Sequence, residues 1–206
     1  MSKRTKQMLI PIPTAKQVED EMRKFSKGVA VYDDLALNLA FGEHPKNIDR
    51  AEVLLKVVSL NWLYNTRIMN VRPVVDRILA LNLDAALQKA DPKIIDKLKV
   101  IKFKTRTINM YSFASKYCSF HRPNDYPIYD RYVDMALRYF RSADQRIKFA
   151  NDDLRDYSSY KRIVLEFAEL YGLTKAKGFC LKALDKYLLS VGKTLEFLRR
   201  QQMEVR

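Results

Sequence analysis

The chain has 206 residues, 48% of them hydrophobic, and 38 Lys and Arg against 24 Asp and Glu give a formal net charge of +14. That length and apolar content suffice for one continuous core without disulfides. No stretch approaches the ~20 apolar residues of a membrane span, and Pro11 and Pro13 leave the apolar part of the N-terminus too short for a signal peptide. We therefore expect a cytoplasmic protein with no membrane association.

The sequence contains few residues or motifs that bind metals or cofactors. Cys118 and Cys180 are the only cysteines, so neither a disulfide framework nor a four-cysteine site is available. A zinc set would need Cys118 and His121 together with the distant Cys180 and His44, whereas structural zinc sites bring their ligands as close pairs. The motifs GxxxxGK[ST], GxGxxG, HExxH and GxSxG are all absent from the sequence. We expect no metal and no other cofactor.

The positive charge is concentrated in two segments, residues 97–106 and the chain from Lys175 onward. A strong basic excess favours polyanionic partners, here nucleic acid, with DNA favoured over RNA. The alternatives are faces that only keep the protein soluble, or a protein-interaction domain that meets an acidic partner. The acid-free segment contributes five candidate phosphate contacts: Lys97, Lys99, Lys102, Lys104 and Arg106.

Helix starts and stops are frequent in the first half, and five glycines and few alternating β-branched runs give little strand signal. Residues 1–13 read as a flexible basic arm. Thr14 with Gln17 forms a capping box for a helix that Gly28 ends. The next predicted helix covers 35–41; Asp33 or Asp34 caps it and Gly42 stops it. A helix over 50–66 follows, capped by Asp49 and with Trp62 as a core anchor. A helix over 72–81 has Pro73 in its first turn, and two short helices begin at Asp84 and at Asp91-Pro92.

In the second half, residues 99–107 are predicted to be a loop or an extended connector. A helix over 108–121 follows, and Asp130 opens the next one. Ser142 with Gln145 reads as a capping box. The last predicted helices lie within 159–172, ended by Gly172, and 174–200. The chain is thus an all-α compact bundle of nine or ten helices, forming one domain or two packed lobes.

Residues 111–132 combine aromatic, amide, hydroxyl and basic side chains. This mixture suits a groove that stacks on bases and holds phosphates. The alternative is that Tyr111, Tyr117 and Tyr129 are interior tyrosines around Asp130. Cys118 is expected to be a buried structural thiol. The groove adds candidate nucleic-acid contacts at Lys116, Arg122, Tyr126, Tyr129 and Arg131.

Across residues 50–140 the order of helices, together with Pro127-Ile128-Tyr129-Asp130, resembles the helix-hairpin-helix DNA glycosylase superfamily. The resemblance implies a glycosylase-like fold, with Asp130 in the place of the catalytic aspartate that stabilises charge on the sugar. The family's glycine-rich hairpin is replaced by KFKTRTINMY, in which Lys102, Lys104 and Arg106 would supply ionic contacts. No lysine aligns with the family's nucleophile, since Lys116 lies about two turns too late. We rank nucleic-acid binding first, base excision second and protein interaction third.

Overall fold

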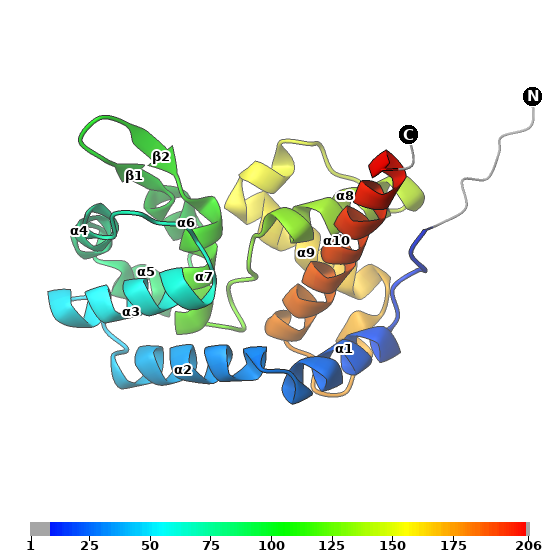
Figure 1. Ribbon diagram of the computed structural model, residues 1–206, viewed down its shortest axis with the longest axis horizontal. Coiled ribbons are helices and arrows are strands. Elements are labelled where there is room, and N and C mark those ends of the chain that lie inside the picture. Colours follow the sequence, from blue (N-terminus) through cyan, green and yellow to red (C-terminus); the bar gives the residue numbers. More distant parts are fainter. Residues whose placement is uncertain (1–8, 205–206) are drawn as a thin grey trace, which may run out of the picture.

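The computed structural model describes residues 9–204, which form ten α-helices and one small hairpin (Figure 1). The predicted all-α fold class is confirmed. No helix within these residues is long and apolar enough to cross a membrane. The helices are α1 (Ala15–Lys27), α2 (Ala30–Glu43), α3 (Arg50–Leu63), α4 (Arg72–Leu81), α5 (Leu83–Gln88), α6 (Lys93–Leu98), α7 (Tyr111–His121), α8 (Arg131–Ala143), α9 (Tyr157–Leu170) and α10 (Leu181–Glu204).

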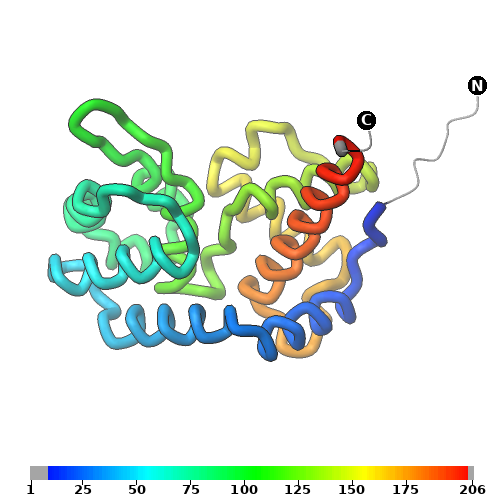
Figure 2. Tube along the Cα trace, viewed as in Figure 1, coloured from blue at the N-terminus to red at the C-terminus, as the bar shows by residue number. Residues whose placement is uncertain are grey.

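The helices gather into two lobes, and the chain passes between them twice (Figure 2). The first lobe contains α2 to α7 and the hairpin. The second lobe contains α1 and α8 to α10, with α10 packed against both α8 and α1. From Leu9 the chain thus runs in the second lobe through α1, crosses to the first lobe along α2, and returns in the segment between α7 and α8.

Local hydrogen bonds explain where several helices begin. Thr14 and Gln17 form the predicted capping box of α1, in which each side chain binds the backbone of the other residue. Asp49 accepts hydrogen bonds from two amides at the start of α3, and Asp130 accepts one from Tyr132 at the start of α8. Gly172, at φ 62°, follows α9 in the left-handed conformation expected after a helix. These predictions are confirmed.

Two sequence predictions were wrong in detail. The second helix begins at Ala30, so Asp34 lies inside it and caps nothing, and Gly42 is a helical residue that does not stop it. Ser142 lies within α8, and the next α-helix is capped instead by Asp156. The predicted connector is extended, as one of the two alternatives had it, and its strands pair as an antiparallel hairpin of β1 (Val100–Lys102) and β2 (Thr107–Asn109), which was not predicted.

Trp62 is 84% exposed and is not the predicted core anchor. The helix α3 is apolar around most of its circumference, and the face that it buries contains Val53, Val57 and Leu60. The predicted basic arm is also partly wrong. Ile10 is buried against the second lobe, where its amide donates to the Tyr139 hydroxyl at 2.9 Å. The rest of that arm, residues 1–8, lies outside the described residues.

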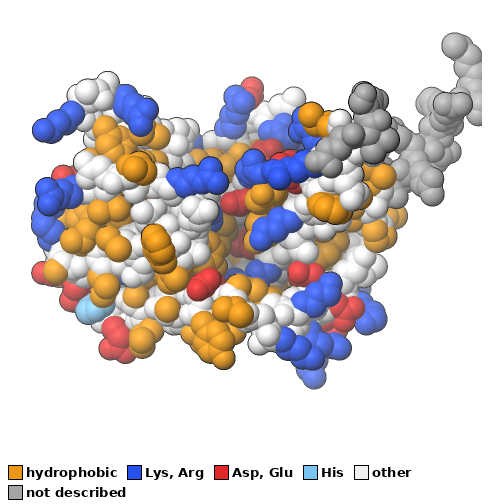
Figure 3. Space-filling view, viewed as in Figure 1, with side chains coloured by type: hydrophobic (Ala, Val, Ile, Leu, Met, Phe, Trp, Pro, Cys, Tyr) orange, Lys and Arg blue, Asp and Glu red, His pale blue; other side chains and the backbone are white. Residues whose placement is uncertain are grey.

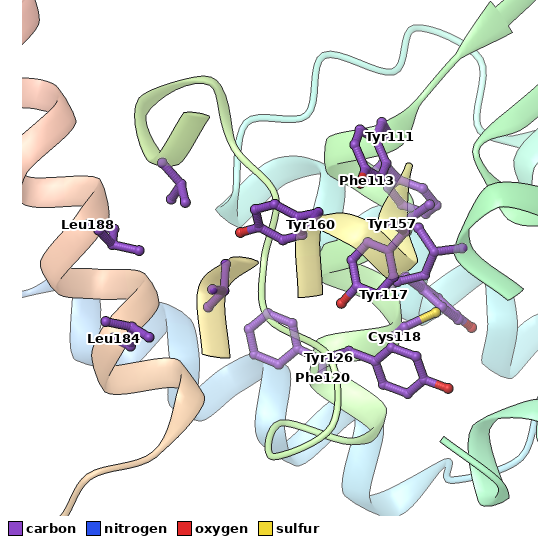
Figure 4. Close-up of a cluster of buried hydrophobic side chains, with 14 of the residues drawn as sticks. Tyr111, Phe113, Tyr117, Cys118, Phe120, Tyr126, Tyr157, Tyr160, Leu184 and Leu188 are labelled. Carbon is purple, nitrogen blue, oxygen red and sulfur yellow. The ribbon is translucent and has the colours of Figure 1, made fainter. Parts of the chain in front are cut away.

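Aromatic side chains from both lobes form one buried cluster (Figure 4). Tyr111 and Tyr117 come from α7 in the first lobe, and Tyr157 and Tyr160 come from α9 in the second. The ring of Tyr111 meets that of Tyr157 edge to face, with their centroids 6.1 Å apart. The core is therefore continuous between the lobes, and this contact fixes α7 relative to the second lobe.

Candidate functional site

A cleft of about 1140 Å³ opens between the two lobes. Its walls come from α1, α2 and α10, from the end of α3 and the residues after it, from the end of β2 and the first half of α7, and from the start of α8. Figure 3 shows the molecule hollowed at this place, with basic side chains around the hollow and acidic ones within it. Eight Lys and Arg line the cleft against five Asp and Glu, so its lining is cationic. The basic residues are Lys24, Arg67, Lys116, Arg131, Lys182, Lys186, Lys193 and Arg200.

The cleft joins two of the predicted site residues. Lys116, on α7 of the first lobe, places its Nζ atom 3.3 Å from Oδ2 of Asp130, at the start of α8 in the second lobe. The lysine side chain is 9% exposed and the aspartate side chain 19%. Burial lowers the pKa of the Lys116 ammonium, and the carboxylate of Asp130 opposes that effect. The pair is thus a partly desolvated amine and carboxylate at the wall of a cationic cleft.

The backbone before Asp130 is held from several sides. The hydroxyls of Tyr157 and Tyr160 donate to the carbonyl oxygens of Pro127 and Ile128 at 2.8 and 2.6 Å. The amide of Ile128 donates to Oδ2 of Asp185, on α10, at 2.8 Å. Because buried backbone groups need such partners, these bonds fix the turn. They therefore fix the position of the Asp130 carboxylate relative to Lys116.

Most of the predicted tyrosine-rich groove is interior. Tyr126 is fully buried and donates its hydroxyl proton to the carbonyl oxygens of Ala86 and Asp91, so it is not available to a ligand. Tyr129 stacks on Tyr111 with ring centroids 4.1 Å apart and donates to Asp134. The hydroxyls of Tyr126 and Tyr129 find partners in the interior, whereas the hydroxyl of Tyr111 is buried without one. The interior alternative for Tyr111, Tyr117 and Tyr129 fits this arrangement.

The predicted basic contacts separate into three groups. Arg131 lines the cleft and pairs with Glu196 of α10 at 3.4 Å. Lys99 points away from the cleft, toward Asp96 and the carbonyl oxygen of Arg155, and its role is structural. The remaining residues are exposed and lie outside the cleft lining. Arg122, at the end of α7, pairs with Asp125, and the other four lie on or next to the hairpin: Lys97, Lys102, Lys104 and Arg106.

Sequence reasoning missed the cleft residues that come from distant parts of the chain. Asp34, Tyr64, Lys182, Asp185 and Lys186 all line it. The spacing of charged residues in the last helix indicated part of the site, because Lys182, Asp185 and Lys186 fall on one helical face. Nothing local indicated that this face meets Asp34, which lies 152 positions before Lys186.

Metal ligation has no geometric support in the part of the chain that the structure describes, since no three His, Cys, Asp or Glu side chains gather there as ligands. Cys118 is fully buried, and burial raises the pKa of its thiol above the usual range. His121 Nε2 lies 3.1 Å from Oδ1 of Asn47 in a buried network. Burial lowers the pKa of His121 to about 3, so its ring is neutral in the folded protein at pH 7.

Comparison with known proteins shows to which family the chain belongs. The family model HI_0787_N, described as an N-terminal domain, matches residues 16–125. An uncharacterized protein of Haemophilus influenzae is 31% identical over 172 residues, which cover 80% of this chain and 81% of the relative. The chain belongs to this family. No solved structure matches it.

Proposed function

We propose that this protein binds nucleic acid in the cleft between its lobes. The cationic lining of the cleft is the observation that supports the proposal most directly, because neutralisation of phosphates by Lys and Arg is the main source of affinity for nucleic acids. The cleft volume of about 1140 Å³ leaves room for a nucleotide and part of its backbone. The tyrosine-rich stacking surface is no part of this proposal.

The basic hairpin supplies a second contact region next to the cleft. Ile108, Asn109 and Met110 line the cleft at the base of β2. The three cations Lys102, Lys104 and Arg106 are exposed and form no ion pairs within residues 9–204. A strand of nucleic acid that leaves the cleft along the hairpin would meet these three charges.

Binding is tested by anisotropy of labelled duplex DNA, single-stranded DNA and RNA over a salt series. We expect affinity to fall steeply with salt, because each neutralised phosphate releases counterions. Changing Lys102, Lys104 and Arg106 together to alanine should lower the logarithmic salt slope by roughly 0.9 for each duplex phosphate that the variant no longer neutralises. The matched control changes the exposed Lys46, Lys89 and Lys148 to alanine and leaves the slope nearly unchanged.

Two results would contradict this proposal. The first is undetectable binding to all three polymers at low salt, which would favour an acidic protein partner. The second is an equal loss of affinity in the hairpin and control variants, which would mean that only net charge matters. Preference among the three polymers follows from the same titrations.

Base excision is the second candidate function, and the contact between Lys116 and Asp130 favours it. An amine whose pKa is lowered by burial is a better nucleophile at neutral pH. In this reaction neutral Nζ attacks C1′ of the nucleotide, the bond from C1′ to the base breaks, and the base leaves with the bonding electrons and takes up the proton that Nζ loses. The bond from C1′ to O4′ then opens, which gives an iminium that borohydride can reduce. Asp130 would stabilise positive charge that develops on the sugar. The helix-hairpin-helix resemblance assigned the catalytic position to Asp130, but Lys116 does not align with the nucleophile of that family, so the role of Lys116 rests on its contact with Asp130.

Borohydride trapping on duplexes with deaminated, alkylated or oxidised bases tests this candidate. A covalent adduct that forms with the native protein and does not form with Lys116→Gln supports it. Asp130→Asn should retain DNA binding and lose excision, because asparagine caps a helix as well as aspartate but has no charge. Native protein that excises no base from this panel removes the candidate and leaves nucleic-acid binding in place.

A further inference from the structure

A second group of charged side chains lies in the cleft, where α2 of the first lobe meets α10 of the second. The Nζ atoms of Lys186 and Lys182 lie 2.7 and 3.3 Å from the same carboxylate oxygen, Oδ2 of Asp34. Tyr64 donates its hydroxyl proton to the other oxygen, Oδ1. The lysine side chains are 12% and 16% exposed. We call these four residues the Asp34 cluster, which is a largely buried feature of the cleft wall.

Aromatic rings position both ammonium groups of the Asp34 cluster. Lys182 Nζ lies 4.2 Å from the ring centroid of Phe120, and Lys186 Nζ lies 2.9 Å from that of Phe25. A ring face attracts a cation without neutralising its charge. The two lysines are therefore held in place while their charge is only partly compensated.

The Asp34 cluster has one more cation than anions. Lys182, Lys186 and Tyr64 lower the pKa of Asp34 in spite of its burial, so this carboxylate is ionised. The further acid between the two lysines on α10 is Asp185, which is buried, and burial raises its pKa to about 8. Two ammonium groups thus face one carboxylate. Burial also lowers the pKa of Lys186, and an incoming anion would oppose that effect.

Tyr64 connects the Asp34 cluster to the pair formed by Lys116 and Asp130. Its hydroxyl binds Asp34, and the centroid of its ring lies 5.7 Å from Lys116 Nζ. The two charged groups therefore adjoin each other in one cleft. A ligand with an anionic group at Lys182 and Lys186 would place the atoms next to that group near Lys116.

We propose that Lys182 and Lys186 form a phosphoryl-binding subsite, with Asp34 holding their ammonium groups in position. The proposal deepens the proposed function and rests on it for the rest of the ligand, which is a nucleotide. The phosphoryl group comes either from the phosphodiester backbone or from a terminal phosphate. A terminal monoester carries about −1.5 to −2 charges at pH 7 and a diester carries about −1, so the monoester interacts more strongly with the surplus cation.

The subsite is tested with the full chain by isothermal titration against deoxyadenosine 5′-monophosphate, deoxyadenosine and inorganic phosphate. The monophosphate should bind at least about tenfold more tightly than the nucleoside, since a hydrogen bond to a charged group is worth ~1.4 kcal/mol or more. Lys182→Gln removes the surplus positive charge of the Asp34 cluster and leaves Asp34 paired with Lys186. It should therefore abolish the preference for the monophosphate over the nucleoside. The control Lys89→Gln makes the same charge change at an exposed position outside the cleft lining and should leave the preference intact.

A second set of titrations uses an oligonucleotide with and without a 5′-phosphate. A stronger effect of Lys182→Gln on the phosphorylated strand assigns the subsite to the terminal group, and an equal effect on both assigns it to the backbone. If Lys182→Gln unfolds the chain, Lys186→Gln makes the same comparison while Lys182 stays beside Asp34. Circular dichroism reports on folding in each case.

Failure of the subsite and failure of nucleic-acid binding give different results. If the oligonucleotides bind and Lys182→Gln and Lys186→Gln both bind them as the native chain does, the subsite is wrong and nucleic-acid binding stands. If the monophosphate binds in a Lys182-dependent manner and no oligonucleotide binds, the subsite stands and the polymer is not the ligand. Equal affinity for the monophosphate and the nucleoside overturns the subsite.

Discussion

Gly192 of α10 lies directly against the backbone of Tyr132 in α8, and a methyl group at Gly192 would overlap the carbonyl oxygen of Tyr132. Because backbone atoms cannot move aside as a side chain does, the two helices would have to separate. These residues belong to the most extensively packed pair of helices in the second lobe. Their close approach determines how near α10 lies to the start of α8, and hence where Lys186 lies relative to Asp130.

Gly192→Ala should therefore destabilise the fold by about 3 kcal/mol, the upper range for overpacking. The control is Gly42→Ala, also in a helix, where an added methyl group meets nothing within 4 Å. That change should raise stability by about 0.5 kcal/mol, because alanine restricts the unfolded chain. Urea unfolding measures both free energies. Equal effects at the two positions would contradict the close packing of α10 on α8.

Asp130 has two structural partners, and substitutions separate their contributions. Its Oδ1 atom caps α8 through the amide of Tyr132 at 2.9 Å, and its Oδ2 atom binds Lys116. Asparagine retains the cap and loses the charge, so Asp130→Asn should cost on the order of 1 kcal/mol. Alanine loses both interactions and should cost about 1 kcal/mol more.

A double-mutant cycle with Lys116→Met checks that assignment. In the Lys116→Met background no ammonium is left without its partner, so Asp130→Asn should become nearly neutral. Thermal unfolding of the four proteins gives the coupling energy. Additive effects of Lys116→Met and Asp130→Asn would mean that the two side chains do not interact in solution.

Trp62 should behave as a surface residue, because 84% of it is exposed. We expect emission close to that of free indole, efficient quenching by acrylamide, and a change in stability within about 0.5 kcal/mol for Trp62→Ala. Blue-shifted, protected emission would contradict the exposed position. Nucleic acid that quenches this emission would place the end of α3 at the interface, next to the cleft-lining segment that begins at Leu63.

The sequence predicted features that depend on near neighbours in the chain. Thr14, Asp49 and Asp130 cap helices through bonds that span two or three residues, and those patterns are visible without a fold. The face of α3 was not predictable in the same way. Apolar residues surround most of that helix, so periodicity did not distinguish the buried Val57 from the exposed Trp62.

The candidate site depends on contacts between distant residues, and the sequence therefore indicated only parts of it. Asp130 and Lys116 were both singled out, but their contact follows from the packing of α7 against the second lobe. Asp34 looked like a helix cap because it precedes an apolar run. Its burial beside Lys186 requires α2 and α10 to meet, and no local pattern specifies that meeting.

Asp185 is 5% exposed, and only its Oδ2 atom has a hydrogen-bond partner, the amide of Ile128. Burial raises its pKa from 3.8 to about 8, and the cations Lys182 and Lys186 partly oppose that effect. In the folded protein this carboxyl group thus keeps its proton between about pH 4 and pH 8, whereas in the unfolded chain it loses it. Because the folded state then binds more protons than the unfolded state, stability falls as pH rises through this range.

Asp185→Asn should remove that dependence, since the amide oxygen still accepts from Ile128 and the side chain cannot ionise. We expect the variant to match the native protein near pH 4 and to become progressively more stable than it as pH approaches 8, with a constant difference above pH 8. Thermal midpoints of both proteins at half-unit pH steps measure this difference. Comparison of the two proteins cancels the contributions of groups that they share, including His121 and Lys56. A difference that does not change between pH 4 and pH 8 would mean that Asp185 is ionised in the folded protein.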